Sequence, residues 1–184
     1  MAKIALDIDS TLHHYWELLD RIAQERFGVP LPYEEQRQWG ITQLPREDIV
    51  ACVRETHSDE NILAAEPYPG AVETVATWHE AGHWIHVTSH RSGSAREATE
   101  AWLERIGMPY DDLHLSFDKV PRCAELGIDL LVDDSPVNLA QAAEHGILGA
   151  TLRHPWTEAL DGDVIVAADW HELRERLEPV LARR

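Results

Sequence analysis

The sequence has little cysteine and little positive charge. Its 184 residues include only two cysteines, Cys52 and Cys123, and they do not form the spaced pair that marks a disulfide framework or a zinc site. We expect both to be small, partly buried hydrophobic residues in a reducing compartment. The chain carries 16 Lys and Arg against 33 Asp and Glu, a net charge of −17. Because such a field repels polyphosphates, we expect neither a nucleic-acid polymer nor a membrane surface as partner.

Long hydrophobic runs are also missing. The N-terminal run, residues 3–6, is followed at once by Asp7 and Asp9, so it predicts neither a signal peptide nor a membrane span. A cytoplasmic location is therefore expected. A hydrophobic content of 44% with 27% charged residues is ordinary for a globular protein. The length suits one full core with a small addition. A homodimer is compatible with the sequence, which does not fix the oligomeric state.

Short apolar runs alternate with segments of helical periodicity. The predicted strands are residues 3–6, 84–87, 113–115, 129–132, 147–151 and 164–167. The predicted helices between them are residues 71–81, 95–106, 136–144 and 170–181. This alternation favours an α/β fold with a parallel sheet and helices on both faces.

One interval breaks the alternation. About 75 residues without a convincing strand separate the first two predicted strands, far more than one crossover helix needs. Within it, helices are predicted at residues 14–26, 33–39 and 45–57. We interpret residues 12–66 as a helical insert, which leaves residues 1–11 and 67–184 for the main domain.

Histidine is abundant and produces an H-E-x-x-H pentapeptide from His79 to His83. A zinc protease needs one helix that continues through both histidines. Here Gly82 indicates a helix end, and a strand is predicted from residue 84. With 11 histidines in the chain, we interpret the pentapeptide as a chance match outside the site.

Acidic and hydroxyl side chains follow the predicted strands at the edge where open parallel sheets bind ligands. They are Asp7, Asp9, Ser10 and Thr11 after the first strand, Thr88 and Ser89 after the second, and Asp133 and Asp134 after the fourth. Lys119 precedes the short helix before the fourth strand. Several carboxylates in one crevice repel each other unless a cation lies between them. Hard oxygen ligands of this kind favour Mg²⁺.

Such a site suits phosphoryl transfer. The metal and Lys119 would neutralise a phosphate, to which Thr88 and nearby groups such as Ser89 would donate hydrogen bonds. Asp7 is the candidate nucleophile, which would form an aspartyl-phosphate. Asp9 is the candidate general acid and base.

In this order, the four motifs resemble those of the haloacid dehalogenase superfamily of phosphatases. The resemblance implies a Rossmann-like core, with Mg²⁺ held by Asp7, by the carbonyl of Asp9 and by Asp133, and with Asp134 in support. Because dehalogenases of this superfamily lack the second acid, it implies phosphate ester hydrolysis. It also implies that residues 12–66 form a small cap that selects the substrate.

Within the superfamily, residues 69–71, the Thr88-Ser89 turn and residues 131–136 are most similar to the 5'(3')-deoxyribonucleotidases. Ser10 stands where these enzymes usually have Gly, and Ser135 where they often have Arg. The similarity implies a (deoxy)nucleoside monophosphate as substrate. The alternatives are a sugar-phosphate or other small-metabolite phosphatase or phosphotransferase, and a non-catalytic module that binds a phosphorylated ligand.

Residues near the first two motifs are candidates for a substrate pocket, namely His13, Tyr15, Trp16 and Arg91. The alternatives are an ordinary amphipathic helix for the first three and a solvated Arg91. Tyr33 and Trp39 could stack on a nucleobase or belong to the core of the insert. We assign Trp102, Trp156 and Trp170 to packing.

Overall fold

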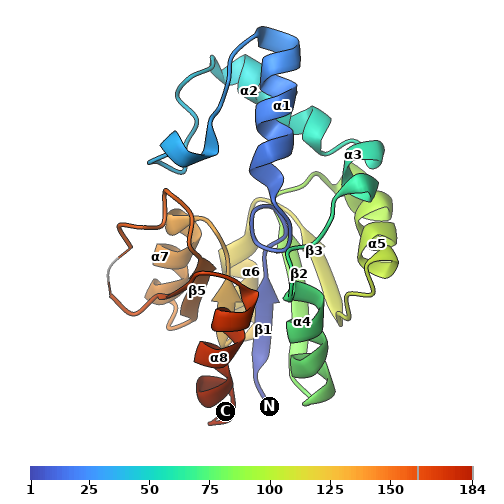
Figure 1. The fold of residues 1–184 in the computed structure, drawn as a ribbon. Coiled ribbons are helices and arrows are strands. Elements are labelled where there is room, and N and C mark those ends of the chain that lie inside the picture. The colour runs from blue at the N-terminus through green and yellow to red at the C-terminus, as the bar shows by residue number, and fades with distance from the viewer. Residues whose placement is uncertain (161, 184) are drawn as a thin grey trace.

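A six-stranded, wholly parallel sheet forms the centre of the computed structural model, which describes residues 1–160 and 162–183 (Figure 1). The strand order is β3-β2-β1-β4-β5-β6. The strands are β1 (Lys3–Leu6), β2 (Trp84–Ser89), β3 (Asp112–Leu115), β4 (Leu130–Val132), β5 (Leu148–Leu152) and β6 (Ile165–Ala167). β1 pairs with β2 on one side and β4 on the other. The expected α/β fold is therefore confirmed. The chain adds β2 and β3 on one side of β1 and β4, β5 and β6 on the other, so its progression across the sheet reverses at β1.

Helices cover both faces of the sheet. They are α4 (Ala71–Glu80), α5 (Arg96–Arg105), α6 (Lys119–Leu126), α7 (Pro136–Glu144) and α8 (Trp170–Leu181), and the short helix η2 (Gly93–Ala95) leads into α5. Side chains of α4, α5 and α8 share one buried cluster with alternate residues of β1 and β2. Side chains of α6 and α7 pack with Ala5 and Leu131, which point to the opposite face. Alternate strand residues thus serve two cores, as expected for a doubly covered parallel sheet.

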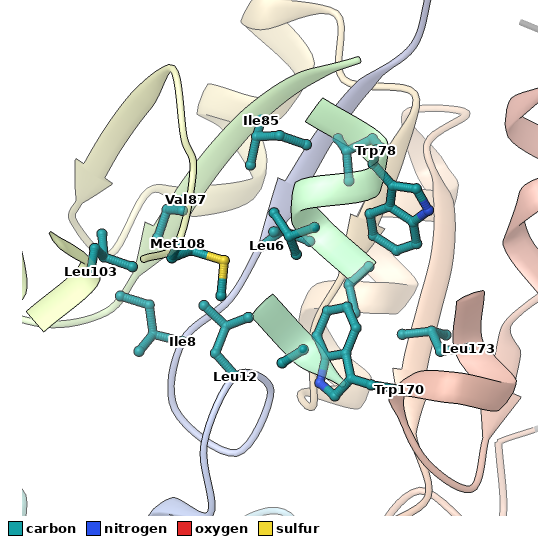
Figure 2. Packing of buried hydrophobic residues seen from close by; sticks show 14 of the residues in the cluster. Leu6, Ile8, Leu12, Trp78, Ile85, Val87, Leu103, Met108, Trp170 and Leu173 are labelled. Atoms are coloured by element: carbon teal, nitrogen blue, oxygen red, sulfur yellow. The ribbon is translucent and has the colours of Figure 1, made fainter. Parts of the chain in front are cut away.

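The larger of these cores contains three tryptophans, Trp78, Trp102 and Trp170. Figure 2 shows Trp78 and Trp170 beside Leu6 and Ile85 of the central strands. Trp102 and Trp170 are fully buried, and the indole N–H of Trp170 donates to the carbonyl of Thr11 at 2.9 Å. The packing role predicted for Trp102 and Trp170 is confirmed, and Trp170 also holds the loop that follows β1.

The segment between β1 and β2 contains α1 (Tyr15–Phe27), η1 (Tyr33–Glu35), α2 (Arg46–Thr56) and α3 (Asp59–Ala64). In Figure 1, α1 and α2 lie above the carboxyl edge of the sheet. They enclose a core of their own, which includes Trp16, Leu19, Cys52 and, from the β5–β6 loop, Trp156. α3 differs, because Ile62 belongs to the large sheet core. Both cysteines are fully buried rather than partly buried as expected.

The sequence-based boundaries hold for the elements with clear periodicity, and two features of the insert differ. The helix predicted at residues 33–39 is wrong, since only η1 forms there. The chain instead folds around the buried Gln36 amide, whose Nε2 donates to the carbonyls of Gln38 and Gly40 at 2.8 and 3.1 Å. α3 was not predicted, although Ser58 provides its N-cap, with Oγ accepting from the amide of Asn61 at 3.4 Å.

Within the described ranges, no helix combines the length and the apolar character needed to cross a bilayer.

Candidate active site

The central position of β1 brings three sequence motifs together. Because β2 and β4 flank β1 in parallel register, the carboxyl ends of the three strands lie side by side at one edge of the sheet. Asp7 follows β1, Asp133 follows β4, and Thr88 is the next-to-last residue of β2. The amide of Asp7 donates to the carbonyl of Val132 at 2.9 Å, which extends the ladder by one bond. Ser10 then takes a left-handed conformation with φ of 62° and turns the chain back over the edge. The strand pattern, rather than any local motif, creates the site.

Lys119 joins two of the carboxylates. It is the first residue of α6 and is 2% exposed. Its Nζ donates to Asp7 Oδ1 at 2.5 Å and to Asp133 Oδ2 at 2.8 Å. Although burial alone would lower it, the pKa of Lys119 is raised by the carboxylates of Asp133 and Asp7. The ammonium group is therefore a fixed positive charge in the centre of the site.

Asp133 is held by a network that the sequence did not reveal. Its Oδ1 accepts the Ser135 amide at 2.8 Å, and Asn138 Nδ2 lies 3.1 Å from each carboxylate oxygen. Ser135 is also the N-cap of α7. The start of α7 thus fixes the orientation of Asp133 for a charged ligand. Asn138 could have been recognised from the sequence as a partner of Asp133 only by placing it in the first turn of that helix.

Asp7, Asp133 and Asp134 form a candidate metal centre. Each offers a carboxylate oxygen, and these three atoms lie within 4.8 Å of one another. Burial, followed in effect by the charges of Asp133 and Asp9, raises the pKa of Asp7 to about 7 against the attraction of Lys119. Burial and the neighbouring carboxylates also raise the pKa of Asp134 well above its usual value. These residues fit a hard divalent cation, because one Lys cannot neutralise three clustered carboxylates.

The side chain of Asp9 lies in a different environment. Arg91 donates through Nη2 to Oδ1 at 2.7 Å and through Nε to Oδ2 at 3.2 Å. Ser89 Oγ donates to Oδ2 at 3.2 Å, while His13 Nε2 lies 3.1 Å from Oδ1 and His57 Nε2 lies 3.4 Å from Oδ2. Although burial opposes ionisation, Arg91 and the hydrogen bond from His13 hold the pKa of Asp9 well below its usual value. Asp9 is thus an ionised carboxylate held from several sides.

The two hydroxyl residues predicted to bind phosphate have separate environments. Thr88 is fully buried, and its Oγ1 has no hydrogen-bond partner. A buried hydroxyl without a partner costs about 1–3 kcal/mol, so Thr88 has an unused donor next to Asp7. Ser89 instead accepts the Arg91 amide at 3.2 Å while donating to Asp9. Ser89 therefore supports Asp9 through its side chain.

A cavity of about 290 Å³ opens above these groups. Asp7, Asp9, Lys119 and Asp133 are among the polar residues that line it. Its apolar wall comes mainly from the insert, through Tyr15, Trp16, Leu19, Ile41, Ile49 and Val53. The cavity therefore has a charged part at the sheet edge and an apolar part beneath α1 and α2.

The predicted pocket residues divide between the cavity and the support of Asp9. Tyr15 and Trp16 line the cavity, whereas His13 and Arg91 are not among its lining residues. The alternative of a solvated Arg91 is wrong, because its side chain is buried against Asp9. His57, which sequence reasoning missed, lines the cavity at the end of α2.

Two further aromatic residues connect the insert to the sheet edge. Trp39 is 42% exposed, lines the cavity, and donates through Nε1 to Asp134 Oδ2 at 3.3 Å. Tyr33 contacts His154 through its hydroxyl, 2.7 Å from Nδ1, and packs with Trp156. Of the two alternatives for these residues, nucleobase stacking and packing in the core of the insert, the contacts of Tyr33 correspond to packing. Trp39 reaches across the opening of the site.

The histidines of the H-E-x-x-H pentapeptide lie on different elements, away from this cavity. His79 is in α4, which ends at Glu80, and β2 begins at Trp84. His79 Nε2 lies 3.4 Å from Asp111 Oδ1, and His83 Nδ1 accepts the Ala2 amide at 3.0 Å. The predicted helix end at Gly82, with φ of 87°, is confirmed. The helix geometry required for a zinc protease is therefore not present at these residues.

Comparison with known proteins agrees with this geometry. The model of the family "5' nucleotidase, deoxy (Pyrimidine), cytosolic type C protein" matches residues 1–183. The chain belongs to this nucleotidase family. It is 26% identical over 187 residues to the "Putative 5'(3')-deoxyribonucleotidase" of Chlorobaculum tepidum, covering 95% of this chain and 89% of that protein. It is also 29% identical over 150 residues to the "Putative nucleotidase" of Oceanobacillus iheyensis, covering 76% of this chain and 80% of that protein.

Solved structures share the fold. A HAD hydrolase of family IA from Entamoeba histolytica aligns over 100% of both chains with a TM-score of 0.69 and 13% identity. CbbY from Rhodobacter sphaeroides, in complex with xylulose-(1,5)bisphosphate, aligns over 94% of this chain and 96% of its own with a TM-score of 0.65 and 18% identity. The nucleotidase family together with this fold identifies the chain as a phosphatase of the haloacid dehalogenase type.

Proposed function

We propose that this nucleotidase is a Mg²⁺-dependent phosphomonoester hydrolase that acts on (deoxy)nucleoside monophosphates through an aspartyl-phosphate at Asp7. One observation carries the proposal. A buried group of Asp7, Lys119 and Asp133 lies at the charged end of a cavity whose other walls are largely apolar. Such a cavity suits a ligand with one anionic end and one flat, weakly polar end.

Each residue then has a defined task. Lys119 binds the phosphate and offsets its charge, and the unpartnered hydroxyl of Thr88 donates to a phosphate oxygen. Asp7 attacks phosphorus. Asp9, which is ionised in the free protein, takes up a proton as the anionic phosphate ester binds beside it, gives that proton to the leaving alcohol and later accepts one from water. A bound Mg²⁺, held by Asp7, Asp133 and the Asp9 carbonyl with Asp134 beside them, would neutralise the carboxylates and the phosphate.

The charge of the cavity supports a monophosphate over a bisphosphate. Among its lining residues, all within the described ranges, Lys119 is the only Lys or Arg. A second phosphate would need a second cation, whereas the far wall offers Leu19, Ile49 and Val53. A nucleoside buries its base against such a wall, with Tyr15 and Trp16 available for aromatic contact. Sugar phosphates, with many hydroxyls, would leave polar groups unpaired there.

We further infer that residues 12–66 act as a cap over a core formed by residues 1–11 and 67–184. The separate core between α1 and α2 supports this division. α3 ties one end of the cap to the main domain, because Ile62 packs in the sheet core, and the indole of Trp102 donates to the carbonyl of Ala65, which follows α3, at 2.8 Å.

The test is a phosphate-release screen with Mg²⁺ across nucleoside monophosphates, sugar phosphates, sugar bisphosphates and small phosphorylated acids. We expect (deoxy)nucleoside monophosphates to be the best substrates, with loss of activity in EDTA and in Asp7→Asn. Asp163→Asn is the matched control, because Asp163 is an exposed acid outside the site. Activity that persists in EDTA or in Asp7→Asn would refute the mechanism. A clear preference for sugar phosphates would refute the substrate alone.

A further inference from the structure

Arg91 is a buried arginine whose side chain is fixed on every side. Its side chain is 1% exposed, and two of its nitrogens bind the two oxygens of Asp9 at 2.7 and 3.2 Å. The third, Nη1, donates to Thr99 Oγ1 at 3.3 Å. The guanidinium carbon lies 5.8 Å from the centre of the Trp102 ring. Burying a guanidinium is costly unless its partners are well placed, so this arrangement calls for a role.

The partner of Arg91 faces the cavity, while Arg91 does not. Asp9 lines the cavity with a side chain that is 17% exposed, and Arg91 is absent from the lining residues. Arg91 thus stands behind Asp9 and is separated from any substrate by it. Two parallel N–H donors on one carboxylate fix the plane of that carboxylate as well as its position. A lysine could supply the charge but not the fork.

We propose that Arg91 is the positioning residue for Asp9 in the second half-reaction, in which water hydrolyses the aspartyl-phosphate; the inference rests on the proposed function. In that step, the water oxygen forms a bond to phosphorus, and the bond between phosphorus and the Asp7 oxygen breaks with its electron pair left on Asp7. The proton of the water passes to the Asp9 carboxylate. The carboxylate must therefore present an oxygen to a small, weakly held water molecule, for which orientation matters most.

The first half-reaction depends less on this orientation when the leaving group is good. p-Nitrophenolate leaves without needing a proton, so Arg91→Gln should still form the phosphoenzyme from p-nitrophenyl phosphate. Misplacing the base should then slow the second step by roughly 10²-fold, the scale of a misplaced catalytic group. We expect a rapid burst of about one p-nitrophenolate per enzyme followed by slow turnover, with kcat and KM lowered together.

The burst is measured by stopped flow with Mg²⁺ present, and the trapped intermediate by intact mass after an acid quench. Arg91→Lys keeps the charge but loses the two parallel donors, so it should slow the second step less than Arg91→Gln does. Thr99→Val removes the acceptor that holds Nη1 and should shift kinetics in the same direction by less. Arg174→Gln is the matched control, because Arg174 is an exposed residue of α8 paired with Glu178, and it should behave like the wild type.

Each outcome decides the question. Arg91 variants that turn over without accumulating phosphoenzyme, while the wild type hydrolyses the ester through Asp7, would overturn the role of Arg91 and leave the proposed function in place. A wild-type protein without Asp7-dependent hydrolysis would overturn both. If Arg91→Gln does not fold, as judged by circular dichroism, then Arg91→Lys and Thr99→Val provide the test. A ratio of burst rate to steady-state turnover rate equal to that of the wild type in both variants refutes the proposal.

Discussion

Without a divalent cation, the carboxylate cluster should make the fold less stable as the pH rises. The pKa of Asp7 is about 7 in the folded chain, against an ordinary value of 3.8. A carboxyl with a raised pKa binds more protons when folded, so its contribution is fully present below pH 3.8 and is lost as the pH rises through about 7. At 1.36 kcal/mol per pKa unit, the loss is about 4 kcal/mol at most. For a chain of this size, that corresponds to a Tm lower by roughly 10 °C.

The assay compares the wild type with Asp7→Asn, which cannot ionise, by thermal unfolding in EDTA from pH 5 to pH 8. We expect the Tm of the wild type to fall relative to that of Asp7→Asn by several degrees over this range. Histidines such as His154, whose pKa burial lowers to about 4, act in the opposite direction, since their contribution grows with pH. They are present in both proteins and cancel in the difference.

Mg²⁺ should reverse this loss of stability at high pH. At 100 times its Kd, a ligand that binds only the folded state adds about 2.7 kcal/mol, and we expect this gain at pH 8 in the wild type but not in Asp133→Asn. Asp163→Asn should follow the wild type throughout. A difference in Tm between the wild type and Asp7→Asn that does not change from pH 5 to pH 8 in EDTA would refute the reasoning, because Lys119 alone would then neutralise the cluster.

Three further outcomes follow from individual residues. Ser10→Gly should be more stable than Ser10→Ala by about 1 kcal/mol in urea unfolding, because Ser10 has a φ of 62° that only glycine adopts without strain; equal stabilities would contradict this. Lys119→Met should abolish turnover and lower the free energy of unfolding in EDTA by about 3–5 kcal/mol, since it leaves two buried carboxylates without their partner; a stable, active variant would contradict the proposed phosphate site. His79→Gln should change stability by no more than about 0.5 kcal/mol and should not alter kcat or KM, because His79 lies on α4 outside the cavity.

The sheet could be predicted from the sequence because its signal is local. β1 and β4 are short apolar runs followed at once by acids, and β1, α7 and α8 have the predicted boundaries. Parallel pairing then places the ends of β1, β2 and β4 side by side, which is why Asp7, Thr88 and Asp133 could be grouped in advance. The insert was less predictable, since residues 36–44 fold around the amide of Gln36 rather than around a repeating pattern.

The partners of each carboxylate could not be predicted in the same way. Arg91 is 82 positions from Asp9, and His57 reaches the same carboxylate from the end of α2. Such pairs depend on how an insert packs on a sheet, and neither periodicity nor residue type encodes that distance. From the sequence, Arg91 was therefore predicted to be a substrate contact. In the structure it is buried behind the Asp9 carboxylate and is not among the residues that line the cavity.

The contrast between Asp7 and Asp9 follows from these partners and bears on the metal. The two acids are separated only by Ile8, yet the surroundings raise the pKa of Asp7 to about 7 and lower that of Asp9. A nucleophile must be ionised, so metal-free Asp7 would be about half protonated near pH 7. A divalent cation between Asp7, Asp133 and Asp134 would lower the pKa of Asp7, because it adds positive charge next to the carboxylate. Asp9 needs no such help, since Arg91 already supplies its charge. The metal would thus keep Asp7 ionised, while Arg91 keeps Asp9 ionised. This division explains why two neighbouring aspartates can have different roles in one reaction.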